Sequence, residues 1–319
     1  MPRPRDLPAR LGDVFHISDI QDAGVNPERM RRSDLLRPFA GVRARREAMH
    51  PLPVEDDLFA RRRAELRAAA ALYAPRLRAG QFFSHETAIA LWDAPLPSFP
   101  SGLPPDVHVS VFGEAPLPRL PGVVAHRARA ATSAAEVIDG LAVSTPATTW
   151  ATSGSFALHD VVALGDFFCR RWRAGVGRPT PDRPPLATID DLAAVVASGR
   201  RVGIPRLREA LPLIREDAWS PRESRLRCLL HDFRLPEPAL NVDVFDDDGR
   251  FLACLDLAFP AQKVGVEYHG LMHTASYARD VERIARLRAA GWTIIEVTAE
   301  SLRDELPLIR RIRAALSRA

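Results

Sequence analysis

The alternation of apolar and polar positions is clearest in the last hundred residues of the chain. Leucines at helical spacing follow Ser220, and three short apolar segments with the period of β-strands come next. The Asp-Gly pair at 248–249 predicts a hairpin turn between the first two strands. The predicted order is helix, three-strand meander, helix, strand and helix, over residues 220–233, 241–245, 251–259, 264–268, 276–290, 292–298 and 301–316.

The region between about residues 53 and 173 mixes helical and strand patterns. Alternating valines predict a strand over 107–111, and a second strand is indicated at 123–126. Helices are predicted over 56–77, 84–92, 147–151 and 158–172. The stretch 174–188 is rich in Gly, Pro and Arg, which is typical of a linker, and two more helices are predicted over 188–198 and 205–216.

The first fifty residues predict two short helices and a basic strand. Ser18 followed by Gln21 has the spacing of a capping box, and Asn26 followed by Pro27 indicates the start of a second helix. Residues 39–46 predict a turn and a basic strand. This order is that of a winged helix-turn-helix, but any small helical hairpin with a solvated basic tail gives the same pattern.

Length and composition indicate a soluble protein of two or three domains. The 319 residues are 46% hydrophobic and 26% charged, with a formal net charge of +4, so binding to nucleic acid is compatible but not required. Lys263 is the only lysine, and the many arginines suit phosphate contacts, although a GC-rich genome explains them equally well. The N-terminus lacks a secretory apolar core, and no apolar run approaches the roughly 20 residues of a membrane span. The odd number of cysteines, without metal-ligand spacing, favours a reducing, cytoplasmic setting: Cys169, Cys228 and Cys254.

Two acidic residues interrupt the apolar strands of the last domain. Asp256 and Glu267 fall on neighbouring strands, and they share a face if residues 260–263 form a tight turn. Two adjacent carboxylates repel one another unless a cation lies between them, so this pattern predicts a metal ion and indicates phosphodiester chemistry. A carboxylate pair held by arginines is the alternative. Glu223 fits a capping box with Ser220, and its carboxylate could also face the hairpin.

Three histidines in the middle region suggest a metal cluster only weakly. His85, His108 and His126 are far apart in sequence, and no carboxylate or cysteine pattern accompanies them. Ordinary, partly buried histidines are the simpler interpretation.

The last hundred residues resemble the PD-(D/E)XK nuclease superfamily, in the branch similar to very-short-patch-repair (Vsr) endonucleases. The resemblance rests on an ordered set of motifs: Ser220-x-x-Glu223-Ser224-Arg225-Leu226-Arg227, Leu235-Pro236-x-Pro238 before Asn241, Leu255-Asp256-Leu257-Ala258, Val266-Glu267-Tyr268-x-Gly270-x-x-His273, Asp280-x-x-Arg283-x-x-x-Leu287 and Gly291-Trp292-x-Ile294. The N-terminal part is similar to the winged-helix region of AbiEi-type antitoxin proteins.

The resemblance implies a Mg²⁺- or Mn²⁺-dependent phosphodiesterase. It makes Asp256 and Glu267 the metal ligands and Glu223 the carboxylate that completes the catalytic site, with His269 and His273 as the remaining polar site residues. The superfamily places lysine two residues after the second acid, and this branch more often has aspartate. His269 stands there instead, either as a general base or as a sign that the site no longer cleaves.

The expected fold is a multidomain α/β (α+β) protein. Its predicted parts are a winged helix-turn-helix at 1–52, an α+β middle domain at 53–173, a linker at 174–188, and a restriction-endonuclease-like domain with a mixed sheet flanked by helices at 189–319.

The expected partner is DNA rather than a membrane, and a homodimer is left open. The arginines expected to contact DNA are Arg29, Arg31, Arg32, Arg43, Arg45, Arg279 and Arg283. The leading hypothesis is a DNA endonuclease of repair or defence. The alternatives are a non-catalytic, antitoxin-like DNA-binding regulator with a degenerate nuclease domain, and an RNA-cleaving toxin.

Overall fold

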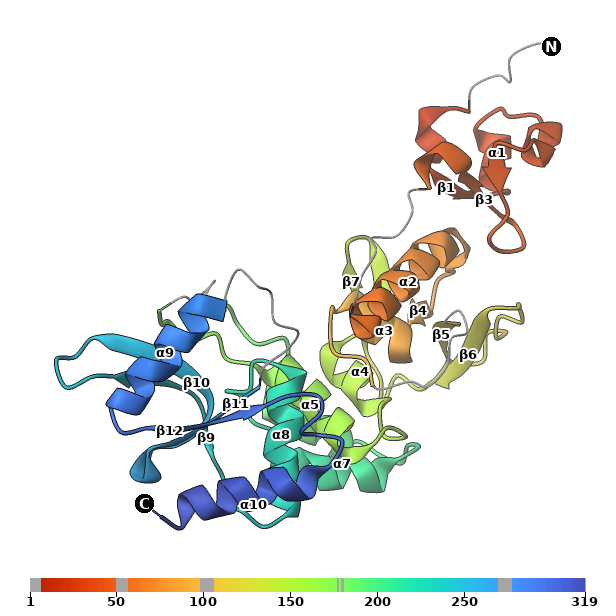
Figure 1. The fold of residues 1–319 in the computed structure, drawn as a ribbon. Coiled ribbons are helices and arrows are strands. Elements are labelled where there is room, and N and C mark those ends of the chain that lie inside the picture. The colour runs from red at the N-terminus through yellow and green to blue at the C-terminus, as the bar shows by residue number, and fades with distance from the viewer. Residues whose placement is uncertain are drawn as a thin grey trace. The chain divides into compact units, whose positions relative to one another are not determined.

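The computed structural model describes residues 7–49, 57–97, 106–176, 178, 181–268 and 277–318, with the backbone alone described at 277–279. The chain has a mixed α+β fold, as predicted, with helices and three separate sheets (Figure 1). It divides into two compact units. The first comprises Met1–Ser155 and Ala194–Ile204, and the second comprises Phe156–Ala193 and Pro205–Ala319.

The N-terminal part of the first unit is a three-stranded antiparallel sheet in the order β1-β3-β2. The basic strand is present, but the expected first helix is split between a strand and a four-residue helix. The elements are η1 (Ala9–Leu11), β1 (Val14–His16), α1 (Asp19–Asp22), η2 (Pro27–Arg31), β2 (Leu35–Leu36), β3 (Val42–Arg45) and η3 (Arg46–Ala48).

The two caps predicted for this region have different outcomes. Asn26 accepts the Glu28 N–H at 2.9 Å, as expected, although it starts a 3₁₀ helix rather than an α-helix. Ser18 makes no capping bond, so the capping box is wrong. Its hydroxyl instead bonds the His16 ring at 2.7 Å and the Asp19 carboxylate at 3.0 Å.

The rest of the first unit contains a five-stranded mixed sheet in the order β6-β5-β4-β8-β7. All the expected helices form here, but three strands were not predicted: β4, β7 and β8. The β7–β8 hairpin had a signal in the sequence, the turn-forming pair Asp139-Gly140. Both residues adopt positive φ in the turn between these strands. The elements are α2 (Leu58–Tyr73), η4 (Ala74–Arg76), β4 (Gln81–Phe83), α3 (His85–Leu91), β5 (Val107–Phe112), β6 (Val123–Ala128), β7 (Ala135–Ile138), β8 (Leu141–Ser144) and α4 (Pro146–Ala151).

The second unit is built on a four-stranded sheet in the order β12-β11-β10-β9. Strands β9, β10 and β11 form the predicted antiparallel meander. Strand β12 pairs with β11 in parallel. The end of α6 and the first residue of α7 belong to the first unit. The elements from α5 onward are α5 (Leu158–Cys169), α6 (Ile189–Ala197), α7 (Ile204–Ala210), η5 (Leu211–Leu213), α8 (Pro221–Asp232), β9 (Ala239–Phe245), β10 (Phe251–Phe259), η6 (Pro260–Gln262), β11 (Val264–Tyr268), α9 (Tyr277–Ala289), β12 (Thr293–Val297) and α10 (Glu305–Leu316).

Two apolar clusters show how helices cover this sheet. Leucines of α8 and the apolar stripe of α10 pack with Val264 and Val266 of β11. Leu287 of α9 packs in the other cluster, with Leu255 and Ile294. The helices α9 and α10 therefore lie on opposite faces of the sheet (Figure 1).

A buried ion pair fixes α8 against α5. Asp166 and Arg227 are each 1% exposed, and Arg227 Nη2 lies 2.9 Å from Asp166 Oδ2. Burial raises the pKa of Asp166, while the Arg227 charge and the Arg215 N–H act in the opposite direction. The sequence placed this region of α5 in the middle domain, but its ion pairs join it to α8 of the second unit.

Arg227→Ala should destabilise the second unit strongly, because it leaves the Asp166 carboxylate buried without its counterion. We expect a loss of about 3–5 kcal/mol in the free energy of unfolding, measured by urea denaturation. Arg225→Ala is the matched control, since Arg225 joins the same helices through the less buried Asp160 and should cost about 1 kcal/mol or less. Equal effects of the two substitutions would contradict this account.

Candidate functional site

The register of the β10–β11 hairpin brings the two predicted acids together. Leu257 pairs with Val266 and Ala258 with Gly265, so Asp256 and Glu267 directly follow the last of these pairs. The connection is the 3₁₀ turn η6, which ends at Lys263 in the left-handed region at φ 48°. The predicted tight turn is therefore present, and Glu267 is close enough for its charge to act on Asp256.

Glu223 reaches the same site from the first turn of α8 and is only 5% exposed. Its N–H donates to the Ser220 hydroxyl at 3.2 Å, as a capping residue should. Its carboxylate accepts the Trp219 N–H at 2.9 Å and the Asn241 side-chain amide at 2.7 Å. Burial raises the pKa of Glu223, and these hydrogen bonds counteract the shift. The helix cap and the site therefore use the same residue.

Burial and the neighbouring acids both shift the pKa of Asp256. It is raised to about 7, first by burial and then by the negative charge of Glu223, with Glu267 adding to the effect. The Tyr268 N–H, which donates to Asp256 Oδ2 at 3.0 Å, and the Arg283 charge lower the pKa. Among the side chains described at 181–268 and 280–318, Asp256 forms no ion pair.

Arg283 of α9 lies in the acidic site rather than on an open surface. Its Nη1 contacts Glu267 Oε1 at 2.6 Å, and its Nε lies 3.6 Å from Asp280 Oδ1. Burial opposes the charge of Arg283, but the surrounding carboxylates outweigh burial and raise its pKa. Arg283 was expected to contact DNA, and in this structure it is a counterion of Glu267.

Asn241 is a site residue to which the sequence assigned no role. It sits in strand β9 with a positive φ of 50°, a conformation that asparagine adopts more readily than most residues. Its amide bridges the Asp217 carbonyl at 2.7 Å and the Glu223 carboxylate. An asparagine among alternating apolar residues was the available signal, but its partners lie 18 and 24 residues away.

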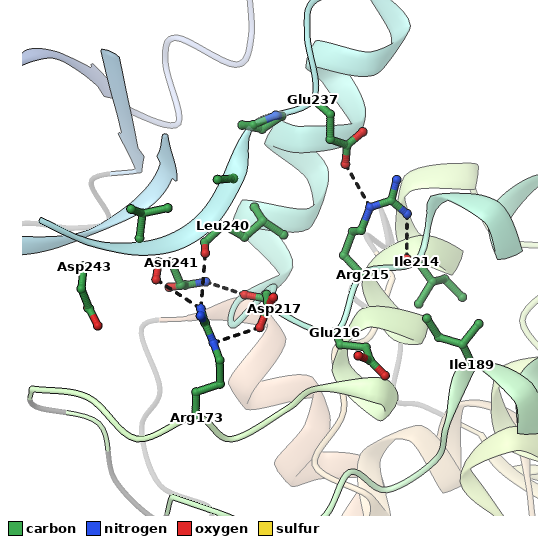
Figure 2. A pocket seen from close by; sticks show the side chains of 13 residues that line it. Arg173, Ile189, Ile214, Arg215, Glu216, Asp217, Glu237, Leu240, Asn241 and Asp243 are labelled. Carbon is green, nitrogen blue, oxygen red and sulfur yellow. Dashed lines mark hydrogen bonds and ion pairs between the residues drawn. The ribbon is translucent and has the colours of Figure 1, made fainter. Parts of the chain in front are cut away.

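An open pocket of about 760 Å³ runs along β9 beside Asn241 (Figure 2). Arg173 lies in it, with Nε 3.0 Å from Asp217 Oδ1, and Arg215 Nε lies 3.1 Å from Glu237. Its charged lining has two arginines against four acids, which does not favour a phosphate backbone: Arg173, Arg215, Glu216, Asp217, Glu237 and Asp243. The pocket therefore does not add a phosphate site to the acidic cluster.

The N-terminal arginines divide into two groups. Arg43 and Arg45 donate hydrogen bonds to backbone carbonyls, Arg43 to that of Met30 at 2.9 Å and Arg45 to that of Gly12 at 3.0 Å. Burial lowers the pKa of Arg43. Arg29 contacts the Asp34 carboxylate at 2.5 Å. Arg31 and Arg32, in contrast, are exposed and are the members of the predicted set most open to a ligand.

Three predicted site positions lie outside what the structure describes. His269 and His273 fall between the described ranges, and only the backbone of Arg279, within α9, is described. Their predicted roles stay predictions.

The chemistry of the donor set suits a hard divalent cation. Glu223 and Glu267 are both near enough to raise the pKa of Asp256, and carboxylate oxygens are the ligands that Mg²⁺ and Mn²⁺ prefer. A cation beside Asp256 would favour its charged form, which burial and the neighbouring carboxylates disfavour. The residues present therefore fit such an ion.

By fold and site, the chain is a mixed α+β protein with a buried acidic cluster in a four-stranded sheet. It is similar to two uncharacterized proteins of Mycobacterium tuberculosis, MT2308 of strain CDC 1551 / Oshkosh and Rv2248 of strain ATCC 25618 / H37Rv. Each is 34% identical over 130 residues, which cover 40% of this chain and 48% of the relative, so the chain spans about half the length of these relatives. No family model and no solved structure matches the chain. None of the helices in the described ranges is long and apolar enough to cross a bilayer.

Asp256→Asn should stabilise the metal-free protein more at high pH than at low pH. Because the folded-state pKa of Asp256 is raised to about 7, the folded chain binds a proton more tightly than the unfolded chain, and stability falls as pH rises toward that value. The gain in unfolding free energy should be about 2 kcal/mol larger at about pH 8 than at about pH 5, by urea denaturation in EDTA. Asp247→Asn, on the exposed hairpin turn, is the control and should show no such pH dependence.

Proposed function

We propose that the chain is a Mg²⁺-dependent DNA endonuclease whose second unit has a restriction-endonuclease-like, Vsr-like fold. The observation that carries the proposal is that Asp256 and Glu267 directly follow the last pair of the β10–β11 hairpin, close enough for the charge of Glu267 to act on Asp256. Glu223, on a helix that packs against the same sheet, adds a third carboxylate near Asp256. Both the order of motifs in the sequence and this donor set support phosphodiester hydrolysis.

In this proposal Asp256 and Glu267 hold the ion, and Glu223 completes the acidic site. The ion, when bound, polarises a phosphate and lowers the pKa of an attacking water. The Tyr268 N–H orients Asp256 through its Oδ2, and Asn241 orients Glu223 through its side-chain amide. Arg283 balances the charge of Glu267 and adds positive charge at the place where a phosphate would approach. His269 and His273 keep their predicted role as polar residues of the site.

The N-terminal part of the first unit is the proposed DNA-recruiting module. Its strand β1 precedes two short helices, α1 and η2, and strands β2 and β3 follow them to complete the sheet. Its exposed Arg31 and Arg32 can contact phosphates. The internally bonded Arg43 and Arg45 stabilise this module in the proposal, and they are less suited to touch DNA.

Asp256→Ala and Glu267→Ala should each abolish metal-dependent cleavage. We expect the unaltered chain to nick or linearise supercoiled plasmid with Mg²⁺ or Mn²⁺, and each variant to lose at least about 100-fold in rate, because each removes a metal ligand. Asp247→Ala is the control for loss of one acidic residue. The proposal fails if the folded chain cleaves no DNA across relaxed, mismatched and single-stranded substrates. Preferential cleavage of RNA would reassign the substrate.

One observation favours a second candidate, a non-catalytic DNA-binding regulator with a degenerate nuclease domain. Arg283 already neutralises Glu267 at 2.6 Å, as a purely structural carboxylate pair would require. In this candidate the acids stabilise the fold, and DNA binding depends on the exposed arginines of the N-terminal module.

Arg31→Ala with Arg32→Ala should weaken DNA binding about tenfold or more at low salt and reduce its salt dependence, because two phosphate contacts are lost. Fluorescence anisotropy with a labelled duplex measures the effect. The matched control is Arg129→Ala with Arg200→Ala, which removes the same charge from exposed positions of the same unit. Similar losses in the two double variants would point to general electrostatics instead. Binding that survives Asp256→Ala in a chain without cleavage activity supports the regulator.

A further inference from the structure

Three histidines that are far apart in sequence lie together in the first unit. One ring-nitrogen ligand atom from each of His85, His108 and His126 can be chosen so that all lie within 4.8 Å of one another. His108 Nδ1 is 3.0 Å from His126 Nε2, and the His85 and His126 rings stack with centroids 3.6 Å apart. The sequence had favoured separate, ordinary histidines. They are partly buried as expected, but they form one cluster.

The sheet positions two of these histidines directly. In the parallel β5–β6 pair, His108 is level with Val124 and Ser110 is level with His126. His108 and His126 are therefore diagonal neighbours on one face of the sheet. Alternation along β5 sends Val107 and Val109 to the opposite face, where they join the apolar core with α2 and α3.

His85 completes the cluster from the corner between β4 and α3. Its backbone has a positive φ of 52°, which is uncommon for a residue with a side chain. The Ser84 N–H is bonded to the His108 carbonyl at 3.1 Å, which ties this corner to β5. The Ser84 hydroxyl lies 2.9 Å from His85 Nδ1, and it also accepts the Ser110 hydroxyl at 2.8 Å. A partner on Nδ1 leaves Nε2 as the lone-pair donor, as is usual for metal-binding histidines.

Burial keeps the three imidazoles neutral. It lowers the pKa of all three, to about 3 for His85 and about 4 for His108, and repulsion among the rings adds to the shift in these two. The Arg62 guanidinium, which lies 3.9 Å from the Glu86 carboxylate, also lowers the pKa of His108. The three rings therefore carry no charge that would repel a cation.

We propose that His85, His108 and His126 form a zinc site, separate from the acidic cluster. The ion would cross-link the start of α3, next to β4, to strands β5 and β6. Neutral imidazole nitrogens suit Zn²⁺ and poorly suit Mg²⁺. Tetrahedral zinc with bonds of about 2.0–2.1 Å needs nitrogen separations of roughly 3.4 Å, which side-chain rotation reaches from a cluster within 4.8 Å. Three protein ligands leave the fourth position for water or another small donor.

The test measures zinc binding by the full chain after EDTA stripping and removal of the chelator. Titration with ZnCl₂ against a chromophoric chelator should give about one tight equivalent. His108→Gln and His126→Gln should each weaken binding at least about 100-fold, since each removes a ligand. His159→Gln, which alters a histidine paired with Asp232 in the second unit, should bind like the unaltered chain.

A double variant separates this site from the proposed nuclease site. Asp256→Asn with Glu267→Gln removes both proposed Mg²⁺ ligands and should leave the tight zinc equivalent unchanged. Zinc binding that disappears in this double variant but persists in His126→Gln would assign the ion to the carboxylates and overturn the proposal. Failure of DNA cleavage has no bearing on this result, because the readout is metal binding.

A spectroscopic measurement on the unaltered chain tests the site without relying on variants that could misfold. Co²⁺ loaded in place of Zn²⁺ should give the visible absorption of a tetrahedral, nitrogen-rich site, and ZnCl₂ should bleach it. Zinc should also raise the Tm, because it binds the folded chain. Absence of saturable binding, or an oxygen-only octahedral Co²⁺ spectrum, would overturn the proposal.

Discussion

A carboxylate can be buried only where other groups offset its charge, and the second unit is organised around this requirement. Asp166 meets it through Arg227, which joins α5 to α8, and Glu267 meets it through Arg283, which joins β11 to α9. Asp256 accepts the Tyr268 N–H, forms no ion pair with the side chains that the structure describes, and lies near Glu223 and Glu267. A cation beside Asp256 would offset the charge of these acids.

Much of the second unit could be predicted because its signals are local. The Asp-Gly turn, the strand alternation and the cap at Ser220 each act within a few residues, and they predicted the meander and the approach of Asp256 to Glu267. The partner of Arg283 could not be read in this way, because a helical arginine face looks the same whether it meets solvent or a buried acid. The Asn241 role was missed because its partners come from another element.

The first unit was harder to predict because its strands are short and its pairings are non-local. Strands β4 and β8 pair in parallel although Phe83 and Val143 are 60 residues apart, and no turn links them in sequence. The histidine cluster has the same origin, since three different segments each supply one ring. The two candidate metal sites also differ in donor chemistry, oxygen in one and imidazole nitrogen in the other, so hard and borderline ions need not compete for them.

Lys263, the only lysine of the chain, lies in the turn between Asp256 and Glu267, and its Nζ donates to the Ala290 carbonyl at 3.0 Å. A lysine-specific protease therefore has a single target, and a cut there would put the two acids on separate polypeptides. The Lys263 ammonium group is hydrogen-bonded at the end of α9. Its rate of reaction with acylating reagents therefore reports how often this hydrogen bond breaks.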